Sequence, residues 1–201
     1  MKKLIPSLIL LVLLLGSVFI AQRYFITPDI PELYTVPDFE FQSQLGTTFS
    51  NKNFSEKISV ADFIFTNCPG ICPVMSREMY LLYDEFKDSE EIQFVSFSVD
   101  PARDSLEALT AYAESWGVND QRWYFLRTDS TAIQTLYGEG FKLGGELPFS
   151  HSTKFVLIDN HNIIRGYYDF DDPEQIERLK EHLSYLSDDI YKKGDPHVHI
   201  N

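Results

Sequence analysis

The sequence predicts an α/β domain in which a central mixed sheet is flanked by helices. Short runs rich in β-branched and aromatic residues alternate with segments whose apolar residues recur with a helical period. Turn-forming residues such as Asn67 and Pro101 separate these segments. Alternation of this kind is typical of a parallel-dominated sheet that helices cover on both faces.

The first expected strand is residues 59–66, which end at an Asn-Cys-Pro turn. A helix is expected from Pro73, because proline suits a first helical position and four apolar residues follow on one face. These residues are Met75, Met79, Leu82 and Phe86. Both cysteines of the chain, Cys68 and Cys72, therefore lie between the end of a strand and the start of a helix.

The middle of the domain repeats this order. Residues 92–100 form the second expected strand, and Asp104 with Glu107 resembles a capping box that opens a helix ending at Gly117. Residues 122–129 are a third expected strand, and residues 130–140 a short helix.

The last part of the domain is a hairpin followed by a helix. Residues 153–159 and 163–170 are strands joined by the turn 160–162, and this hairpin adds antiparallel pairing at one side of the sheet. Asp172 and Pro173 open a long helix with an apolar stripe. The complete order is the layout of a thioredoxin-like fold.

The N-terminus carries an expected membrane anchor at residues 4–21, after a cytoplasmic end at residues 1–3. This uncharged apolar run reaches about 27 Å at roughly 1.5 Å per residue, close to the thickness of the hydrocarbon layer. A cleaved signal peptide is the alternative, but the run is long for one and is followed by no good cleavage site. A buried core helix is a weaker alternative, because the run is apolar on every side.

The charges around this run predict its orientation. Lys2 and Lys3 precede the run and Arg23 follows it, so the N-terminus is expected in the cytoplasm. The expected location is the bacterial inner membrane, crossed once, with the domain in the periplasm. Residues 22–36 are expected to be a proline-containing linker, residues 37–193 the domain, and residues 194–201 a flexible tail.

The charge of the chain argues against a nucleic-acid partner. Thirty acidic and 17 basic residues give a net charge of −13, which repels a polyanion. An acidic solvated exterior is the simplest explanation of this balance.

The spacing of Cys68 and Cys72 suggests chemistry more than it suggests a structural crosslink. A disulfide between them would close a loop of about five residues and stabilise the fold by only about 2 kcal/mol. At a helix N-terminus, by contrast, backbone N–H groups favour the thiolate, which is both the nucleophile and the metal ligand. Position alone leaves a redox site and a metal site open.

A third ligand would distinguish these two possibilities. Two sulfur ligands suit Cu(I), whereas a structural zinc site normally has four protein ligands. His151 stands directly before the strand 153–159, and in a thioredoxin-like sheet that end of the strand approaches the cysteine loop. His161 is expected in a turn at the opposite end, His182 on the surface of the last helix, and His197 and His199 in the tail.

Three segments together resemble a known family. The stretches "FTNCPGICPVMSREM", "FSVDPARDS" and "SHSTKFVLID", in this order, are similar to the Sco/SenC family of copper-binding cytochrome c oxidase assembly proteins. The resemblance covers roughly residues 37–190. It implies a thioredoxin-like fold that binds copper, as Cu(I) and also as Cu(II), through Cys68, Cys72 and His151.

The resemblance also implies partners. These are the copper-receiving subunit of cytochrome c oxidase, other copper chaperones or thiol reductants, and the membrane through the anchor. One departure is Gly70, where the family often has aspartate between the cysteines. In the second segment Asp100, Arg103 and Asp104 match, either as an ion pair with a helix cap or as a docking surface.

Two functions remain open at this point. The first is a copper metallochaperone that assists assembly of the oxidase copper centre. The alternative is a membrane-anchored thiol-disulfide oxidoreductase that uses Cys68 or Cys72 as a nucleophile, and the two are compatible. A thiol peroxidase is a weaker third interpretation, because no threonine stands ahead of the cysteine at the expected spacing.

Overall fold

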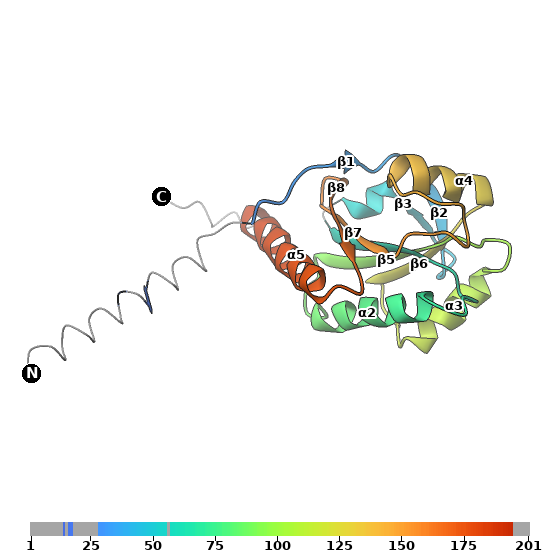
Figure 1. Cartoon of the computed structure of the whole chain (residues 1–201), viewed down its shortest axis with the longest axis horizontal. Helices are drawn as coiled ribbons and strands as arrows, with labels where there is room; N and C mark the ends of the chain where they lie inside the picture. Colours follow the sequence, from blue (N-terminus) through green and yellow to red (C-terminus); the bar gives the residue numbers. More distant parts are fainter. Residues whose placement is uncertain (1–13, 15, 18–27, 56, 195–201) are drawn as a thin grey trace, which may run out of the picture.

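The computed structural model describes residues 14, 16–17, 28–55 and 57–194. The described residues form an eight-stranded sheet with helices on both faces (Figure 1). The strand order is β1-β8-β7-β4-β5-β6-β2-β3. The predicted α/β fold with a mixed sheet and flanking helices is therefore confirmed.

The centre of the sheet is formed by three parallel strands, β4 (Ile58–Ile64), β5 (Ile92–Ser98) and β6 (Trp123–Arg127). Every residue of β4 and β5 is buried, which explains why apolar residues occur on both faces of these strands. Next to β4 lies β7 (Lys154–Ile158), which is antiparallel to it, and β8 (Ile163–Asp169) follows as the predicted hairpin.

The sheet is less parallel than the element order predicts. Only the pairs β4–β5 and β5–β6 are parallel among the described strands, and the remaining pairs are antiparallel. Three short strands at the start of the domain cause much of the difference: β1 (Tyr34–Thr35), β2 (Glu40–Ser43) and β3 (Thr48–Ser50). The sequence does not predict these strands, because two to four residues are too few to show a period.

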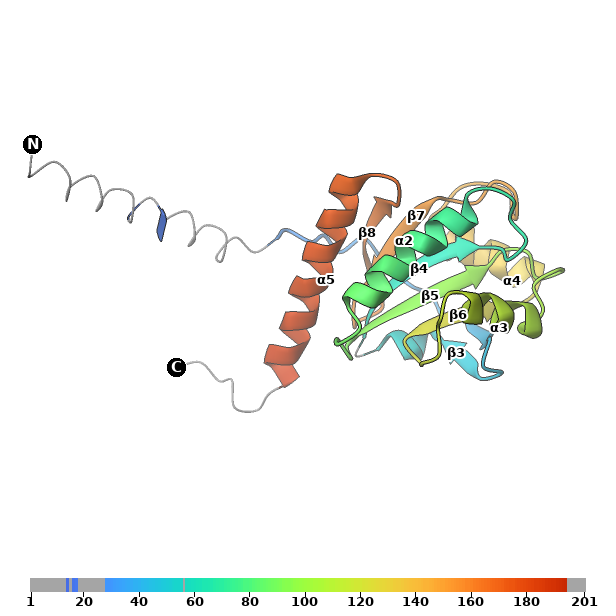
Figure 2. The same ribbon diagram turned by 90° about the horizontal axis from the view of Figure 1, so that it is seen from below.

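Helices cover the two faces of the sheet unequally. On one face lie α2 (Cys72–Glu85), α3 (Leu106–Ser115) and α5 (Pro173–Gly194), and the other carries α4 (Ser130–Thr135) and the π-helical turn η2 (Leu136–Gly140) (Figures 1 and 2). A short 3-10 helix, η1 (Asn51–Phe54), follows β3. The ammonium of Lys180 on α5 lies 2.9 Å from the carboxylate of Glu85 on α2, which ties these two helices together.

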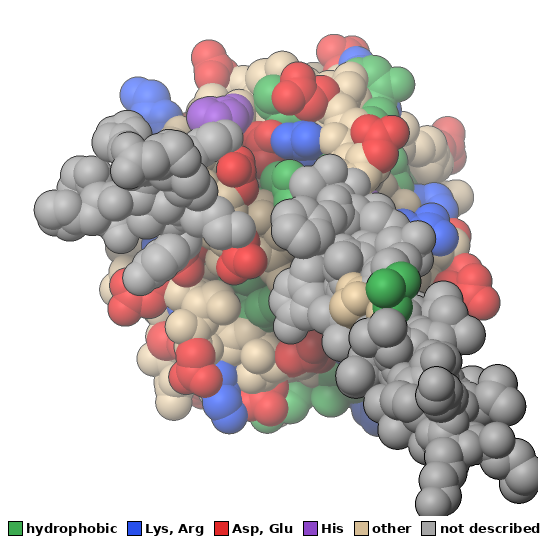
Figure 3. Space-filling view, turned by 90° about the vertical axis from the view of Figure 1, so that its left-hand side faces the viewer, with side chains coloured by type: hydrophobic (Ala, Val, Ile, Leu, Met, Phe, Trp, Pro, Cys, Tyr) green, Lys and Arg blue, Asp and Glu red, His purple; other side chains and the backbone are tan. Residues whose placement is uncertain are grey.

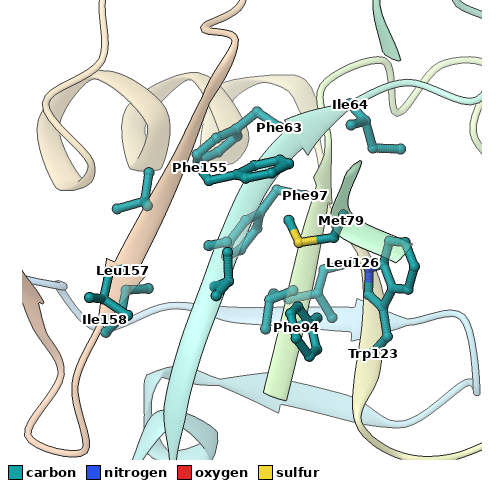
Figure 4. Packing of buried hydrophobic residues seen from close by; sticks show 14 of the residues in the cluster. Phe63, Ile64, Met79, Phe94, Phe97, Trp123, Leu126, Phe155, Leu157 and Ile158 are labelled. Carbon is teal, nitrogen blue, oxygen red and sulfur yellow. The ribbon is translucent and has the colours of Figure 1, made fainter. Parts of the chain in front are cut away.

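Aromatic side chains fill both layers between the sheet and the helices. Phe63 and Phe97 stack with their ring centroids 5.1 Å apart, and Tyr137 meets Phe63 edge to face. Figure 4 shows part of this cluster, with Phe63 and Ile64 pointing to opposite sides of β4. Neighbouring strand residues therefore line different layers, as the pleat requires.

Two local predictions are wrong. Asp104 does not cap α3: the cap is Ser105, whose side chain accepts a hydrogen bond from the Ala108 N–H. His182 is not a surface residue but is buried, with its Nδ1 2.6 Å from the Tyr168 hydroxyl. Asp104 is hydrogen-bonded to Thr66, and His182 to Tyr168. These partners are distant in the sequence, so a local sequence pattern cannot reveal them.

Residues 30–36, part of the segment expected to be a linker, pack against the edge of the sheet. Ile30 and Val36 are buried, and β1 pairs with the start of β8. The guanidinium of Arg165 donates to the carbonyls of Ile30 and Pro31 and also pairs with the buried carboxylate of Asp159. These contacts make residues 30–36 part of the folded unit.

No helix of the described residues is long and apolar enough to cross a membrane. The expected anchor at residues 4–21 lies almost entirely outside the described residues, as do the cytoplasmic end and residues 195–201 of the tail. Seen from the side of α5, the surface carries many Asp and Glu side chains, in line with the net charge of the chain (Figure 3).

Candidate metal centre

The two cysteines lie where strand β4 gives way to helix α2. Cys72 is the first residue of α2 and is fully buried, whereas Cys68 lies in the preceding loop and is partly exposed. Both are free thiols. The structure therefore places the pair at the strand-to-helix junction that the sequence predicts, with two different degrees of exposure.

His151 approaches this junction from β7. Because β7 runs antiparallel to β4, the residues just before β7 lie beside the end of β4. The Nε2 atom of His151 is 3.4 Å from the Sγ atom of Cys72. Its Nδ1 atom is 3.1 Å from the Ser152 carbonyl, and an Nδ1–H that donates there leaves the Nε2 lone pair directed at the sulfur.

Tyr137 holds the histidine loop in place from η2. Its hydroxyl accepts a 2.7 Å hydrogen bond from the Ser152 N–H and donates to the Gly144 carbonyl at 2.8 Å. Phe65 adds an edge-to-face contact with the His151 ring, with centroids 5.8 Å apart. These contacts position the imidazole, and no sequence signal identifies Tyr137 because it lies in the irregular π-helical turn.

Gly145 allows the same loop to close on itself. Its φ angle of +124° lies in the region that favours glycine, and a Cβ atom there would stand 1.8 Å from the Ser150 carbonyl oxygen. The Ser150 N–H in turn donates to the Glu146 carbonyl at 2.9 Å. A side chain at residue 145 would force this turn open and shift His151.

Asp104 fixes the start of the cysteine loop. Its carboxylate is fully buried and accepts hydrogen bonds from the Thr66 N–H, from the Thr66 hydroxyl at 2.6 Å and from the Ser98 hydroxyl at 2.5 Å. It therefore joins the ends of β4 and β5. The expected ion pair between Asp100 and Arg103 is confirmed, with 2.6 Å between nitrogen and oxygen.

The environments of the two thiols differ in their effect on ionisation. Burial alone would raise the pKa of Cys68, but hydrogen bonds from the Cys72 N–H and thiol and from the N–H groups of Gly70 and Ile71 lower it overall. Burial raises the pKa of Cys72 far above its usual value, and the nearby charges of Cys68 and Asp62 add to this. Cys68 is the thiol that ionises first.

His151 is suited to act as a neutral ligand. Burial lowers its pKa, and the Ser152 carbonyl opposes this only in part. A neutral imidazole with a free Nε2 lone pair is the form that binds a metal. At neutral pH the His151 ring therefore has no proton to lose before it binds a metal ion.

Cys72 and His151 are spaced as two ligands of one metal ion. Ligand bonds of about 2.3 Å to sulfur and about 2.0 Å to nitrogen, at a tetrahedral angle, place the two donor atoms about 3.5 Å apart. The observed distance of 3.4 Å fits this value. Among the described residues, no three His, Cys, Asp or Glu side chains form a complete metal-binding group.

The other histidines lie elsewhere. His161 is exposed in the turn between β7 and β8, at the end of the sheet away from the cysteines, and His182 of α5 is hydrogen-bonded to Tyr168 of β8. His197 and His199 lie outside the described residues. Of the histidines that the structure describes, His151 is the one that contacts a cysteine.

Comparisons with known proteins agree with this arrangement of the fold. The family model described as SCO1/SenC matches residues 28–187. The SCO1 protein homolog of Bacillus subtilis (strain 168) is 32% identical over 135 residues, which are 64% of this chain and 70% of that protein.

Two solved structures have the same fold. BsSco, described as a member of the Sco family of cytochrome c oxidase assembly proteins with a disulfide switch, matches with a TM-score of 0.70 and 27% identity. This match covers 80% of this chain and 96% of that structure. Yeast Sco1 with copper bound matches with a TM-score of 0.62 and 21% identity, over 76% and 90% of the two chains, a level that shows the fold alone.

Proposed function

Because the chain belongs to the SCO1/SenC family, we propose that it is a copper-binding protein that assists assembly of the copper centre of cytochrome c oxidase. The observation that carries this proposal is the 3.4 Å contact between Cys72 Sγ and His151 Nε2 beside the second thiol. BsSco belongs to a family of oxidase assembly proteins, which supports the same role.

The three donor atoms have distinct parts in the proposed site. Cys68 and Cys72 supply two thiolates, which suit the soft Cu(I) ion, and His151 supplies Nε2, which also suits Cu(II). Copper is the cargo of this site. The partly exposed Cys68 is the ligand that can meet copper first, and the buried Cys72 and His151 form the more fixed part of the site.

Copper titration of single variants tests this proposal. The full chain in detergent, with both cysteines reduced, is titrated with Cu(I) and with Cu(II) beside Cys68→Ser, Cys72→Ser and His151→Ala. The matched control is His161→Ala, which removes an exposed imidazole at the other end of the sheet. We expect each of the three site variants to lose at least the roughly 10–100-fold in affinity that loss of an outer-shell partner typically causes.

The control variant should bind copper as the unchanged chain does. If His151→Ala bound both copper ions with unchanged affinity, a site that includes this histidine would be excluded. Equal losses in His151→Ala and His161→Ala would point to nonspecific binding by imidazoles.

One observation favours a second function, thiol-disulfide exchange. The pKa of Cys68 is lowered while Cys72 is buried with a raised pKa, which is the asymmetry of an attacking thiol and a resolving thiol. Reduction of a disulfide substrate that continues at an unchanged rate in His151→Ala and stops in Cys68→Ser would support this function. Loss of turnover in both variants would favour the copper site.

The location and the partners follow from the same proposal. We place the domain in the periplasm on a single N-terminal anchor, the side of the membrane on which we expect it to meet the copper-receiving subunit of the oxidase. Other copper chaperones and thiol reductants are the partners that would load or reduce the cysteine pair. Protease accessibility of the domain in intact spheroplasts would test the orientation.

A further inference from the structure

A surface groove lies on the face of the sheet that α4 and η2 cover. One wall is the segment 37–41 at the start of β2, and the other is formed by α4 and η2. The groove encloses about 630 Å³, a volume within the range of about 300–1,000 Å³ that is typical of ligand sites. It is therefore large enough to hold the side chains of a bound molecule.

The floor of the groove is apolar and tightly packed. Phe41 and Leu136 are buried there, and the partly buried ring of Phe39 lies 5.1 Å from that of Phe41. Gly140 lets the two walls meet at the floor, since a Cβ atom on it would stand 3.0 Å from the side chains of Leu136 and Pro37. The groove is thus preformed, and an apolar side chain can enter it without moving the core.

Four carboxylates surround this apolar floor. Glu40 and Glu139 are exposed on opposite walls, and in the part of the chain that the structure describes neither pairs with a basic side chain. Asp38 and Asp129 accept hydrogen bonds from a side-chain amide and from two backbone N–H groups, which carry no positive charge. The ammonium of Lys142, the one basic residue among the described lining residues, lies 5.8 Å from the centroid of a tyrosine ring outside the groove. The groove therefore has a net negative charge above an apolar floor.

Two other grooves of the domain differ in their charge. The groove of about 410 Å³ on the far side of Glu40 includes Arg127. The groove of about 380 Å³ between α2 and α5 includes Lys180, whose ammonium is 2.9 Å from the Glu177 carboxylate. An apolar floor below carboxylates that lack a cation distinguishes the groove beside α4 from both.

We propose that the groove between residues 37–41 and α4–η2 is a docking site for a partner protein segment that carries an apolar side chain beside Lys or Arg. The apolar side chain covers the floor, and the cation pairs with Glu40 and Glu139. An inorganic cation would leave the floor exposed to water, and an anionic lipid or a nucleic acid would be repelled. A basic, apolar peptide segment satisfies both halves of the groove.

The groove is separate from the cysteines. None of its lining residues belongs to the cysteine loop 66–72, and α2, which begins with Cys72, lies on the other face of the sheet. The wall η2 also carries Tyr137, whose hydroxyl binds the Ser152 N–H in the histidine loop. A partner segment in the groove would therefore contact the layer that holds His151 while both cysteines stay free to react.

A peptide titration followed by amide NMR spectra tests the proposal. The full chain in a nonionic detergent, reduced and without metal, is titrated with the capped peptide Lys-Leu-Phe-Lys-Leu and with its acidic counterpart Glu-Leu-Phe-Glu-Leu. The groove variant combines Glu40→Gln with Glu139→Gln. The matched control combines Glu174→Gln with Glu181→Gln, which removes two exposed carboxylates from α5 and changes the net charge equally.

We expect the basic peptide to shift the amide signals of residues 37–41 and 128–142. The groove variant should bind it about 2-fold to 30-fold more weakly, the loss expected for two exposed ion pairs, and the control should bind it as the unchanged chain does. The acidic peptide should leave these signals in place. All substituted residues are exposed, so the spectra of the free variants should otherwise match that of the unchanged chain.

Four results would overturn the proposal. They are equal affinity of the groove variant and the control, equal affinity for the basic and acidic peptides, no shift in the groove at millimolar basic peptide, and shifts centred on Cys68 and His151 instead. The same groove shifts on concentrating the chain without peptide would assign the groove to a second copy and also overturn it. No copper is present, so the copper titration decides the proposed function independently.

Discussion

At the scale of single residues, the candidate site joins side chains that are far apart in the sequence. Cys72 and His151 are separated by 79 positions, yet their donor atoms are 3.4 Å apart. The sequence predicts this meeting because a histidine directly before a strand beside β4 has to lie near the end of β4. It does not predict Tyr137 or Asp104 as positioning residues, since their partners are backbone groups and a strand end that no local pattern reveals.

The buried Asp62 predicts a pH dependence of stability with a definite sign. Burial raises its pKa in the folded chain to about 7, although a hydrogen bond from Ser96 acts in the opposite direction, and the pKa in an unfolded chain is about 3.9. A raised folded-state pKa means that stability is greatest below the unfolded pKa and is lost as pH rises to the folded one. We expect the free energy of unfolding to fall between about pH 4 and pH 7, by an amount on the order of 4 kcal/mol.

Denaturant unfolding of Asp62→Asn measures this loss. The difference in unfolding free energy between the variant and the unchanged chain should grow in favour of the variant across that pH window. A constant difference from pH 4 to pH 8 would show that Asp62 titrates normally. Asp120→Asn provides the comparison, since the Asp120 carboxylate is partly exposed and pairs with Arg122 near the start of β6.

At the scale of elements, the long buried strands and helices are predicted well and the short ones are not. β4, β5, α2 and α5 each carry enough residues for an apolar run or a helical period to show. β1, β2 and β3 have two to four residues each, and pairing with distant strands defines them. For the same reason the antiparallel share of the sheet is larger than the element order suggests.

The connection between β4 and β5 gives a prediction at this scale. Replacing Ser105, the N-cap of α3, with alanine should lower the free energy of unfolding by about 1 kcal/mol. Asp104→Ala should cost about 3 kcal/mol or more, because it leaves two hydroxyls and one backbone N–H without an acceptor. Urea unfolding of both variants compares the two costs.

The outcome distinguishes two interpretations of Asp104. If the two substitutions cost the same, Asp104 acts as the local cap that the sequence pattern suggests. A larger cost for Asp104→Ala, with weaker copper binding, supports its role in fixing the start of the cysteine loop. Ser105→Ala should leave copper affinity unchanged, since Ser105 contacts neither Thr66 nor Ser98.

At the scale of the whole molecule, Arg165 attaches the N-terminal segment to the sheet. Arg165→Met would leave the buried carboxylate of Asp159 without its cation, which we expect to cost about 3–5 kcal/mol. The amides of Leu33 and Val36, which donate to Ile164 and Asn162, should lose most of their protection against hydrogen exchange.

Lys154→Met is the matched control for this prediction. It breaks the pair between Lys154 and Asp169, which is more exposed and should be worth at most about 1 kcal/mol. Hydrogen exchange followed by mass spectrometry reports both variants. Unchanged protection of residues 30–36 in Arg165→Met would show that burial of Ile30 and Val36 alone holds the segment.

The attachment of residues 30–36 also determines how the reactive end of the domain can travel. β1 joins the start of β8, while His151 and the cysteine loop lie past the opposite end of β7, about 17 Å away along five strand residues. Between these points stands a rigid sheet. While β1 stays paired with β8, residues 30–36 are held at that edge and add no free length between the N-terminal segment and Cys68.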